Sequence, residues 1–188
     1  MDELLLNNDR VTLRPLDTVH VDSCFAAVRE SVRELSPWLW WCHEGFQIED
    51  ARSGLAASLA AWKSGTEFNF GIFDPLDGSF LGGCGLNQIN RTDQVANLGY
   101  WVRTSRTGRG LATAATLLVA GFGFEQLGLN RIEIVAATAN HASQRVAEKT
   151  GARREGVLRR RLLVHGNSFD AILYALIETD LVGAAGNS

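Results

Sequence analysis

The stretch Arg106-Thr107-Gly108-Arg109-Gly110-Leu111-Ala112 decides how this chain can be interpreted. It follows a strand-like segment, Leu98 to Val102, and begins a helix rich in small residues that we expect to run to about Leu127. The first N–H groups of a helix have no partner inside the helix, and with the positive end of the helix dipole they bind anions. Gly108 and Gly110 place no Cβ atom in the way of a phosphate. The stretch therefore predicts a site for a phosphate-bearing ligand.

Three arginines, Arg103, Arg106 and Arg109, are expected to bring positive charge to the same turn. Two common phosphate motifs do not fit. The dinucleotide fingerprint requires a third glycine where Thr113 stands, and the nucleotide P-loop requires a Gly-Lys-Ser/Thr sequence that this chain lacks. On these residues alone, a tight turn without a ligand remains the alternative.

The length and composition predict one domain. With 188 residues, of which 46% are hydrophobic, the chain can form a full core, expected over about 10–180 and followed by a flexible tail at 181–188. No apolar run reaches the roughly 18 residues of a membrane span, and the start has no basic segment, so we expect a cytoplasmic protein without membrane contact. The three cysteines, Cys24, Cys42 and Cys84, are widely spaced and indicate buried free thiols rather than a metal site.

Charge is distributed unevenly along the chain. The first 100 residues hold 14 acidic and 7 basic side chains, whereas the remainder holds 7 acidic and 11 basic ones. This asymmetry favours an anionic cofactor on the second half and a cationic acceptor near the first, although a solvated charged face would look the same. The chain is acidic overall and its arginine run at 159–161 has no interleaved aromatic residues, so we expect no nucleic-acid partner.

The hydrophobic pattern predicts a mixed α/β chain with a twisted, mostly antiparallel sheet flanked by helices. Turn residues at 74–78 and around His165-Gly166-Asn167 predict hairpins, and residues 183–188 are expected to fray. The expected strands cover 10–16, 67–73, 80–87, 95–102, 131–137, 156–164 and 169–177, and the expected helices cover 17–34, 48–64, 111–127 and 140–150.

A second motif lies about thirty residues after the glycine turn. It runs Asn140-His141-Ala142-Ser143-Gln144-Arg145-Val146-Ala147-Glu148-Lys149 and ends in Gly151-Ala152. Together the two motifs resemble the GNAT acyltransferase superfamily. Arg14-Pro15-Leu16, Ser36-Pro37-Trp38-Leu39 and Arg154-Glu155-Gly156 resemble its RimJ/RimL-like branch, the ribosomal-protein N-terminal acetyltransferases.

The resemblance implies acetyl-CoA as the co-substrate, no metal, and a homodimer. It implies a splay between the strand that ends at Val102 and the strand at 131–137, for which a β-bulge near Gly99 would be the local cause. In the family, backbone amides hold the pyrophosphate, one strand pairs with the pantetheine arm, and an asparagine binds that arm. The asparagine is also compatible with a plain helix N-cap. The implied cofactor-binding residues are Tyr100, Trp101, Val102, Thr107, Gly108, Arg109, Gly110, Leu111, Ala112, Thr113, Asn140 and Ser143.

Two positions depart from the family pattern. Thr107 replaces a common Gln or Arg, which leaves the backbone amides unaffected, and Ala147 replaces the tyrosine that protonates the leaving thiolate in many members. In the RimL-like branch a serine and a glutamate are the proposed catalytic pair. They match Ser143 as the acid and Glu155 as the base. Helix capping by Ser143, and a salt bridge between Glu155 and the flanking arginines, are the structural alternatives.

The acceptor is the least determined part of the sequence interpretation. Trp38, Trp40 and His43 could line a pocket for an amine, although clustered tryptophans also pack in loops and cores. An α-amine, with a pKa near 8, is partly neutral at cellular pH, so a site without a strong base suits a protein N-terminus better than a lysine. A small amine as acceptor, or a non-catalytic acyl-CoA-binding module, remain the alternatives.

Overall fold

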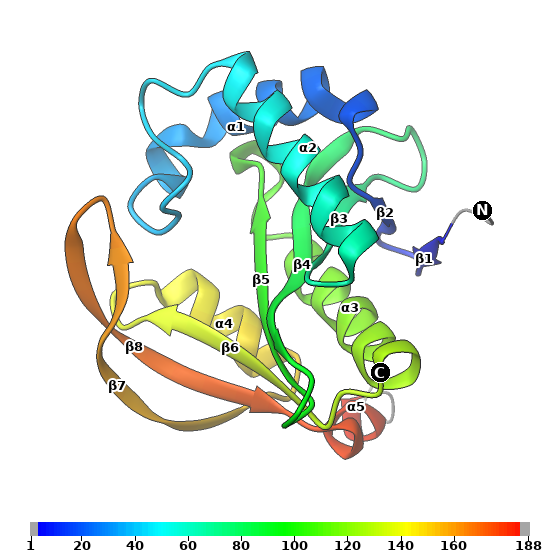
Figure 1. The fold of residues 1–188 in the computed structure, drawn as a ribbon, viewed down its shortest axis with the longest axis vertical. Coiled ribbons are helices and arrows are strands. Elements are labelled where there is room, and N and C mark those ends of the chain that lie inside the picture. Colours follow the sequence, from blue (N-terminus) through cyan, green and yellow to red (C-terminus); the bar gives the residue numbers. More distant parts are fainter. Residues whose placement is uncertain (1–3, 185–188) are drawn as a thin grey trace.

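The computed structural model describes residues 4–184, which form one eight-stranded sheet between two layers of helices (Figure 1). The strand order is β1-β2-β3-β4-β5-β6-β8-β7, and every neighbouring pair is antiparallel except the parallel pair β5–β6. The strands are β1 (Leu6–Asn7), β2 (Thr12–Pro15), β3 (Phe68–Phe73), β4 (Phe80–Asn90), β5 (Val95–Val102), β6 (Arg131–Ala137), β7 (Arg153–Val164) and β8 (Asn167–Leu176).

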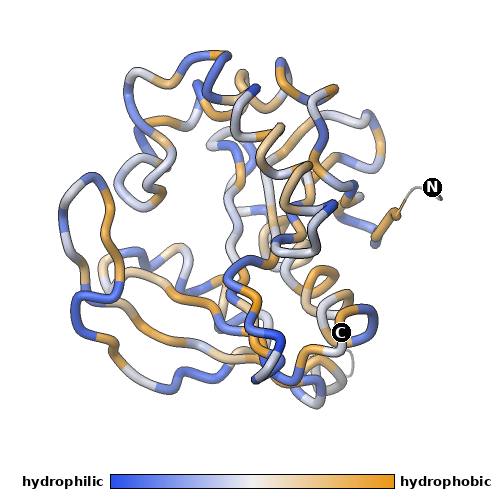
Figure 2. Tube along the Cα trace, in the orientation of Figure 1, coloured by the Kyte–Doolittle hydropathy of each residue, from blue (hydrophilic) through white to orange (hydrophobic). Residues whose placement is uncertain are grey.

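The helices divide between the two faces of the sheet. On one face, α1 and α2 pack with Phe73, Phe80 and Trp101 in a smaller core. On the other face, α3 and α4 contribute to the main core with the inward side chains of β3 to β6. Figure 2 shows hydrophobic residues along α3 and the strands that it covers. The helices are η1 (Thr18–His20), α1 (Val21–Leu35), α2 (Ile48–Ser64), η2 (Thr104–Arg106), α3 (Leu111–Leu127), α4 (His141–Lys149) and α5 (Glu178–Ala184).

Glycines in the left-handed conformation set both ends of α3. Gly110 precedes the first helical residue with φ 76°, and Gly128 follows the last with φ 63° and donates its N–H to the Gly123 carbonyl. Glycine adopts this conformation without a steric cost, so the helix begins and ends where the sequence predicts. The glycine turn therefore lies directly at the carboxyl end of β5, separated from it only by η2.

The mixed α/β class, the mostly antiparallel sheet and the splay are confirmed. The cysteines are free and buried, as expected. The bulge expected near Gly99 is wrong, because Gly99 pairs in regular register with Gly85 and the β4–β5 irregularity lies between Asn87 and Asn90. Two short elements, β1 and α5, were not predicted. Helix α5 includes the start of the expected tail, and residues 185–188 lie outside the described part of the chain.

Gly82 offers a stability test of the β4–β5 pairing. A Cβ atom at this position, where φ is 156°, would lie 2.1 Å from the Trp101 carbonyl oxygen of the neighbouring strand. We expect Gly82→Ala to lower the free energy of unfolding by at least about 2 kcal/mol, measured by chemical denaturation, because the strands must move apart.

Gly121, in the middle of α3, is the matched control. A Cβ atom there meets nothing within 4 Å, so Gly121→Ala should raise the free energy of unfolding by about 0.5–1 kcal/mol through helix propensity. A Gly82→Ala protein as stable as the wild type would contradict the close approach of the two strands.

Candidate active site

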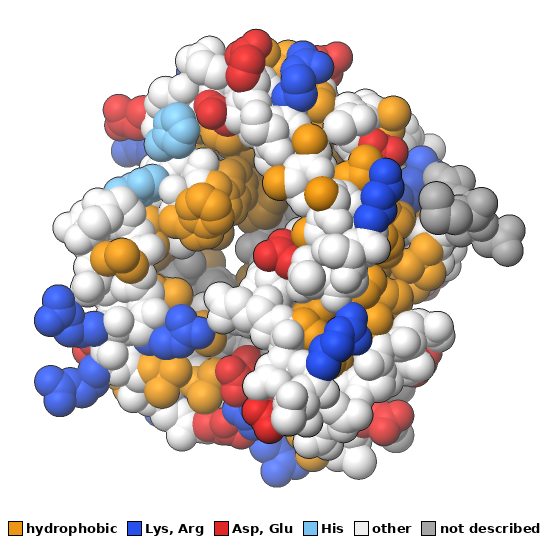
Figure 3. All heavy atoms as spheres, viewed as in Figure 1, with side chains coloured by type: hydrophobic (Ala, Val, Ile, Leu, Met, Phe, Trp, Pro, Cys, Tyr) orange, Lys and Arg blue, Asp and Glu red, His pale blue; other side chains and the backbone are white. Residues whose placement is uncertain are grey.

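The site is built on the place where β5 and β6 separate. The two strands pair only from Val95 to Asn97, opposite Arg131 to Glu133, and no further pair follows. A cleft of about 1390 Å³ passes through this splay and is lined by residues from both faces of the sheet. Figure 3 shows the molecule hollowed between the α1–α2 loop and the β7–β8 hairpin, with hydrophobic side chains along the upper wall.

The glycine turn presents backbone donors to this cleft. Gly108 and Gly110 both have φ 76°, and the first hydrogen bond of α3 runs from the Ala114 N–H to the Gly110 carbonyl at 3.0 Å. The N–H groups of residues 111–113 therefore have no partner inside the helix. These three residues line the cleft together with both glycines. The geometry fits a phosphate group, as the sequence predicts.

The three arginines of this region do not converge on the turn, which corrects the expectation. The Arg103 guanidinium pairs with Glu30, and the Arg106 guanidinium lies 3.7 Å from the Asp74 carboxylate. Arg109 is exposed and does not line the cleft, whereas Arg106 does. Two further basic residues, Arg145 and Lys149, also line the cleft from α4. In the sequence they form an i, i+4 pair, the spacing of neighbours on one helix face.

Helix α1 holds the segment that leads from β5 to the turn. The Glu30 carboxylate accepts hydrogen bonds from the Arg103 side chain and from the Ser105 N–H at 2.8 Å. The Ser31 hydroxyl accepts from the Thr104 N–H at 2.9 Å. The Arg103 guanidinium, followed by the Ser105 donors, lowers the pKa of Glu30 to about 2.

A tyrosine meets the predicted catalytic serine. The Tyr100 hydroxyl donates to the Ser143 carbonyl at 2.8 Å and lies 3.0 Å from the Ser143 Oγ. Tyr100 lies on β5 and Ser143 on the first turn of α4, so this contact spans the splay. Burial raises the pKa of Tyr100, which keeps its hydroxyl protonated. The sequence pattern did not predict this side-chain role, because Tyr100 was expected to act through its backbone.

The predicted asparagine caps α4. The Asn140 side-chain oxygen accepts the Ser143 N–H at 3.1 Å, which is the N-cap role that the sequence left open. Its amide nitrogen makes no hydrogen bond within residues 4–184, and the residue lines the cleft. The cap thus leaves the amide nitrogen available as a donor.

Glu155 lies far from Ser143. It lies at the start of β7 and forms a forked ion pair with Arg131, at 2.8 Å and 2.5 Å. Arg131 begins β6, whereas Ala137, next to α4, ends it about 20 Å away. Arg131 lowers the pKa of Glu155, and a general base needs a pKa near the working pH. The structure therefore does not support Glu155 as the base. It forms a salt bridge, although with Arg131 and not with the flanking arginines that the sequence suggested.

The predicted acceptor residues lie on the opposite wall. Trp38, Trp40 and His43 all line the cleft, and Trp40 is 74% exposed. The wall reaches the β7–β8 turn, where the His165 Nε2 lies 3.0 Å from the Cys42 carbonyl. The α1–α2 loop and the hairpin tip therefore meet above the cleft.

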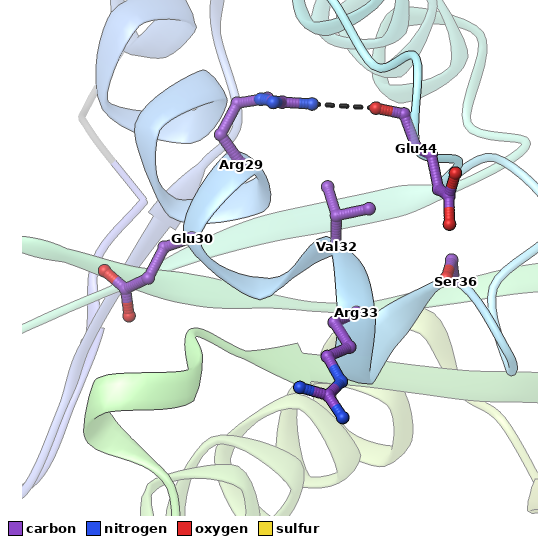
Figure 4. A pocket seen from close by; sticks show the side chains of 6 residues that line it. All are labelled: Arg29, Glu30, Val32, Arg33, Ser36 and Glu44. Carbon is purple, nitrogen blue, oxygen red and sulfur yellow. Dashed lines mark hydrogen bonds between the residues drawn. The ribbon is translucent and has the colours of Figure 1, made fainter.

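A second hollow lies on α1, outside the cleft. Its volume is about 500 Å³, and it is bordered by Arg29, Glu30, Val32, Arg33, Ser36 and Glu44 (Figure 4). Across it the Arg29 side chain donates to the Glu44 carbonyl at 2.8 Å, which ties the α1–α2 loop to the helix. None of the elements of the splay contributes to it, so we assign it a structural role.

Among the described residues, none of the helices combines the length and the apolar composition of a membrane-spanning segment. Residues 4–184 also contain no group of three or more His, Cys, Asp or Glu side chains that could hold a metal ion.

Residues 10–153 match the family described as Acetyltransferase (GNAT) domain. The chain belongs to the GNAT acetyltransferase family. It is therefore an acyltransferase of the GNAT N-acetyltransferase type, and the eight-stranded sheet with its splay is the GNAT fold.

Similar proteins connect this GNAT chain to the RimJ/RimL-like branch. It is 32% identical over 136 residues to the Probable N-acetyltransferase YjcK of Bacillus subtilis (strain 168), covering 72% of this chain and 75% of that protein. It is 24% identical to the Ribosomal-protein-serine acetyltransferase of Escherichia coli (strain K12), over 94% of this chain and 98% of the relative. The structure of Mycobacterium smegmatis RimJ in complex with CoA-disulfide superposes with a TM-score of 0.84 at 27% identity, covering 98% and 96% of the two chains. The predicted resemblance is confirmed.

The contact between Glu30 and the segment before the turn predicts a pH dependence. The folded-state pKa of Glu30, about 2, lies below its ordinary value of 4.5. The stabilising contribution of the Glu30 carboxylate is therefore present above about pH 4.5 and disappears as the pH falls towards 2. Glu30→Gln should therefore lower the free energy of unfolding at pH 7, and the difference from wild type should shrink between pH 4.5 and 2. Urea denaturation at several pH values measures it.

Glu125, exposed on α3, is the matched control. Glu125→Gln should show no such convergence with wild type on acidification. A Glu30→Gln effect that is equal at pH 7 and pH 2.5 would contradict the role of this carboxylate.

Proposed function

We propose that this enzyme transfers the acetyl group of acetyl-CoA to the α-amine of a protein N-terminus, by direct attack within a ternary complex. The observation that carries the proposal is the cleft through the splay. It has the phosphate-binding turn and the Tyr100–Ser143 pair on one side and an aromatic, acidic wall on the other. Relatives named as ribosomal-protein acetyltransferases support this acceptor class.

In this proposal acetyl-CoA lies along the second half of the chain. The N–H groups of Arg109 to Thr113 bind the pyrophosphate, and the β5 segment from Tyr100 to Val102, whose edge towards β6 is left open by the splay, pairs with the pantetheine arm. The Asn140 amide nitrogen donates to the same arm, and Thr107 lines its path. Arg145 and Lys149 supply positive charge close to the turn.

Ser143 acts as the acid in the proposed step. The amine nitrogen forms a bond to the thioester carbon, the carbon–sulfur bond breaks, and the departing sulfur takes the proton of the Ser143 hydroxyl. The nitrogen then loses its surplus proton, which restores the Ser143 hydroxyl. Tyr100 is the positioning residue, because its hydroxyl donates to the Ser143 carbonyl and lies 3.0 Å from Ser143 Oγ, which holds the serine at the splay. Together they fill the role of the tyrosine that Ala147 replaces.

An α-amine suits this site because no strong base adjoins Ser143 in the described structure. Positioning two reactants can supply about 7–11 kcal/mol of the barrier, more than a general base typically adds. An amine with a pKa of about 8 then needs little help to lose its proton. Trp38, Trp40 and His43 form the wall along which the acceptor approaches. A homodimer and a cytoplasmic location stay predictions.

The acceptor class can be tested by mass spectrometry. The enzyme is incubated with acetyl-CoA and either a peptide with a free α-amine or an N-blocked copy carrying an internal lysine, beside a pool of small amines. We expect acetylation of the free α-amine alone. Modification of small amines alone would contradict the proposal, and acetyl-CoA binding without any transfer would favour a non-catalytic module.

The Tyr100–Ser143 pair predicts graded losses of activity. Ser143→Ala should lower kcat about 100-fold, because the departing thiolate loses its proton donor. Tyr100→Phe should lower kcat about tenfold, because one orienting hydrogen bond is lost. The affinity for CoA, measured by calorimetry, should change less than threefold in both.

Thr92→Ala is the control for the pair, since it removes an exposed hydroxyl outside the cleft and should leave kcat unchanged. Equal kcat values for Tyr100→Phe and wild type would remove Tyr100 from the mechanism.

A further inference from the structure

A strip of polar side chains crosses the floor of the cleft on the face that α1 and α2 cover. It consists of Glu67, Asn69, Asn87 and Asn97, all half-buried and all lining the cleft, and we call it the polar strip. Asn69 pairs with Gly85 of β4, and Asn87 pairs with Asn97 of β5. Paired residues of antiparallel strands project to the same face, so the strip runs across three strands from the splay towards α2.

A glycine makes room for the strip. A Cβ atom on Gly85 would lie 2.3 Å from the Asn69 Oδ1, whereas one on Gly99 would make only an ordinary contact, 3.8 Å from the Asn87 Nδ2. The asparagine amides therefore lie over bare backbone next to the position where β5 leaves β6. A ligand chain can follow the strip directly into the splay.

The strip has unused hydrogen-bonding capacity of the kind that a peptide requires. The Asn69 Nδ2 donates to the Glu67 Oε2 at 3.0 Å, and the Asn97 Nδ2 donates to the Asn87 Oδ1 at 3.0 Å. Within residues 4–184 no hydrogen bond engages the remaining amide oxygens of Asn69 and Asn97 or the Asn87 Nδ2. Such a mixture of donors and acceptors matches the N–H and C=O groups of an extended backbone.

Glu67 is the charged member of the strip. Among the described residues it forms no ion pair. The Arg91 guanidinium, from the turn between β4 and β5, donates to the Gly65 carbonyl at 2.7 Å and not to Glu67. The other carboxylates that line the cleft have partners. Glu34 accepts from Thr104, and Asp50 lies 3.8 Å from His43.

We propose that the polar strip binds the first residues of the acceptor peptide and that Glu67 selects acceptors with a positive charge at the second or third residue. The inference rests on the proposed function. Glu67 precedes β3, two strand spacings or about 10 Å from β5, which is the length of about three residues of extended chain. A carboxylate in a cleft that is partly shielded from water attracts a guanidinium or ammonium group more strongly than an exposed carboxylate does.

The test compares two peptides with a free α-amine that differ only by Arg or Glu at the third residue. Wild type should show at least a tenfold higher kcat/KM for the Arg peptide. Glu67→Gln should reduce the preference to less than threefold, and Glu67→Lys should reverse it, with the KM for acetyl-CoA unchanged. Glutamine can still accept the Asn69 hydrogen bond, so the fold should be retained, which thermal melting verifies.

Glu125→Gln removes an exposed carboxylate outside the cleft and should keep the wild-type preference. A wild type that acetylates both peptides equally, or a preference that persists in Glu67→Gln, would overturn this inference and leave the proposed function intact. Failure of the wild type to acetylate either peptide would contradict the proposed function itself.

Discussion

The early separation of β5 from β6 is the constraint on which the site depends. In a continuous parallel pair the backbone groups of β5 beyond Asn97 would bond to β6. Here pairing stops after Glu133, and those groups face the cleft instead. Buried backbone groups need partners, so the opening is stable only next to solvent or a hydrogen-bonding ligand. The opening is spanned by the contact of Tyr100 with Ser143 on one face and bordered by the polar strip on the other.

The charged residues that line the cleft come from different parts of the chain. The basic ones, Arg106, Arg145 and Lys149, belong to the second half, whereas the acidic ones, Glu34, Asp50 and Glu67, belong to the first half. The charge asymmetry along the sequence is thus repeated in the lining of the cleft. Charges of both signs in this lining can orient an anionic and a cationic substrate towards each other.

Local signals predicted most of the fold and part of the site. Gly110 and Gly128 define α3, and the Asn140 motif places the start of α4, because capping depends on neighbours within a few residues. The failures concern partners that are distant in sequence. Glu30 meets Arg103 across 73 positions, and Glu155 meets Arg131 across 24. Such pairs depend on strand register and helix docking, which composition and periodicity do not encode. The polar strip is of the same kind, since its members are separate in sequence and adjoin only through pairing.

The parallel pair β5–β6 requires a crossover, and α3 provides it. As a result, the phosphate turn, the open edge of β5 and the start of α4 all come from one uninterrupted segment of the chain, 95–149. The polar strip takes Glu67, Asn69 and Asn87 from earlier in the chain and only Asn97 from this segment, and the aromatic wall comes from the loop after α1. Most residues of the acceptor wall are therefore separate in the chain from the turn and the start of α4, so they can be substituted with little change to that segment.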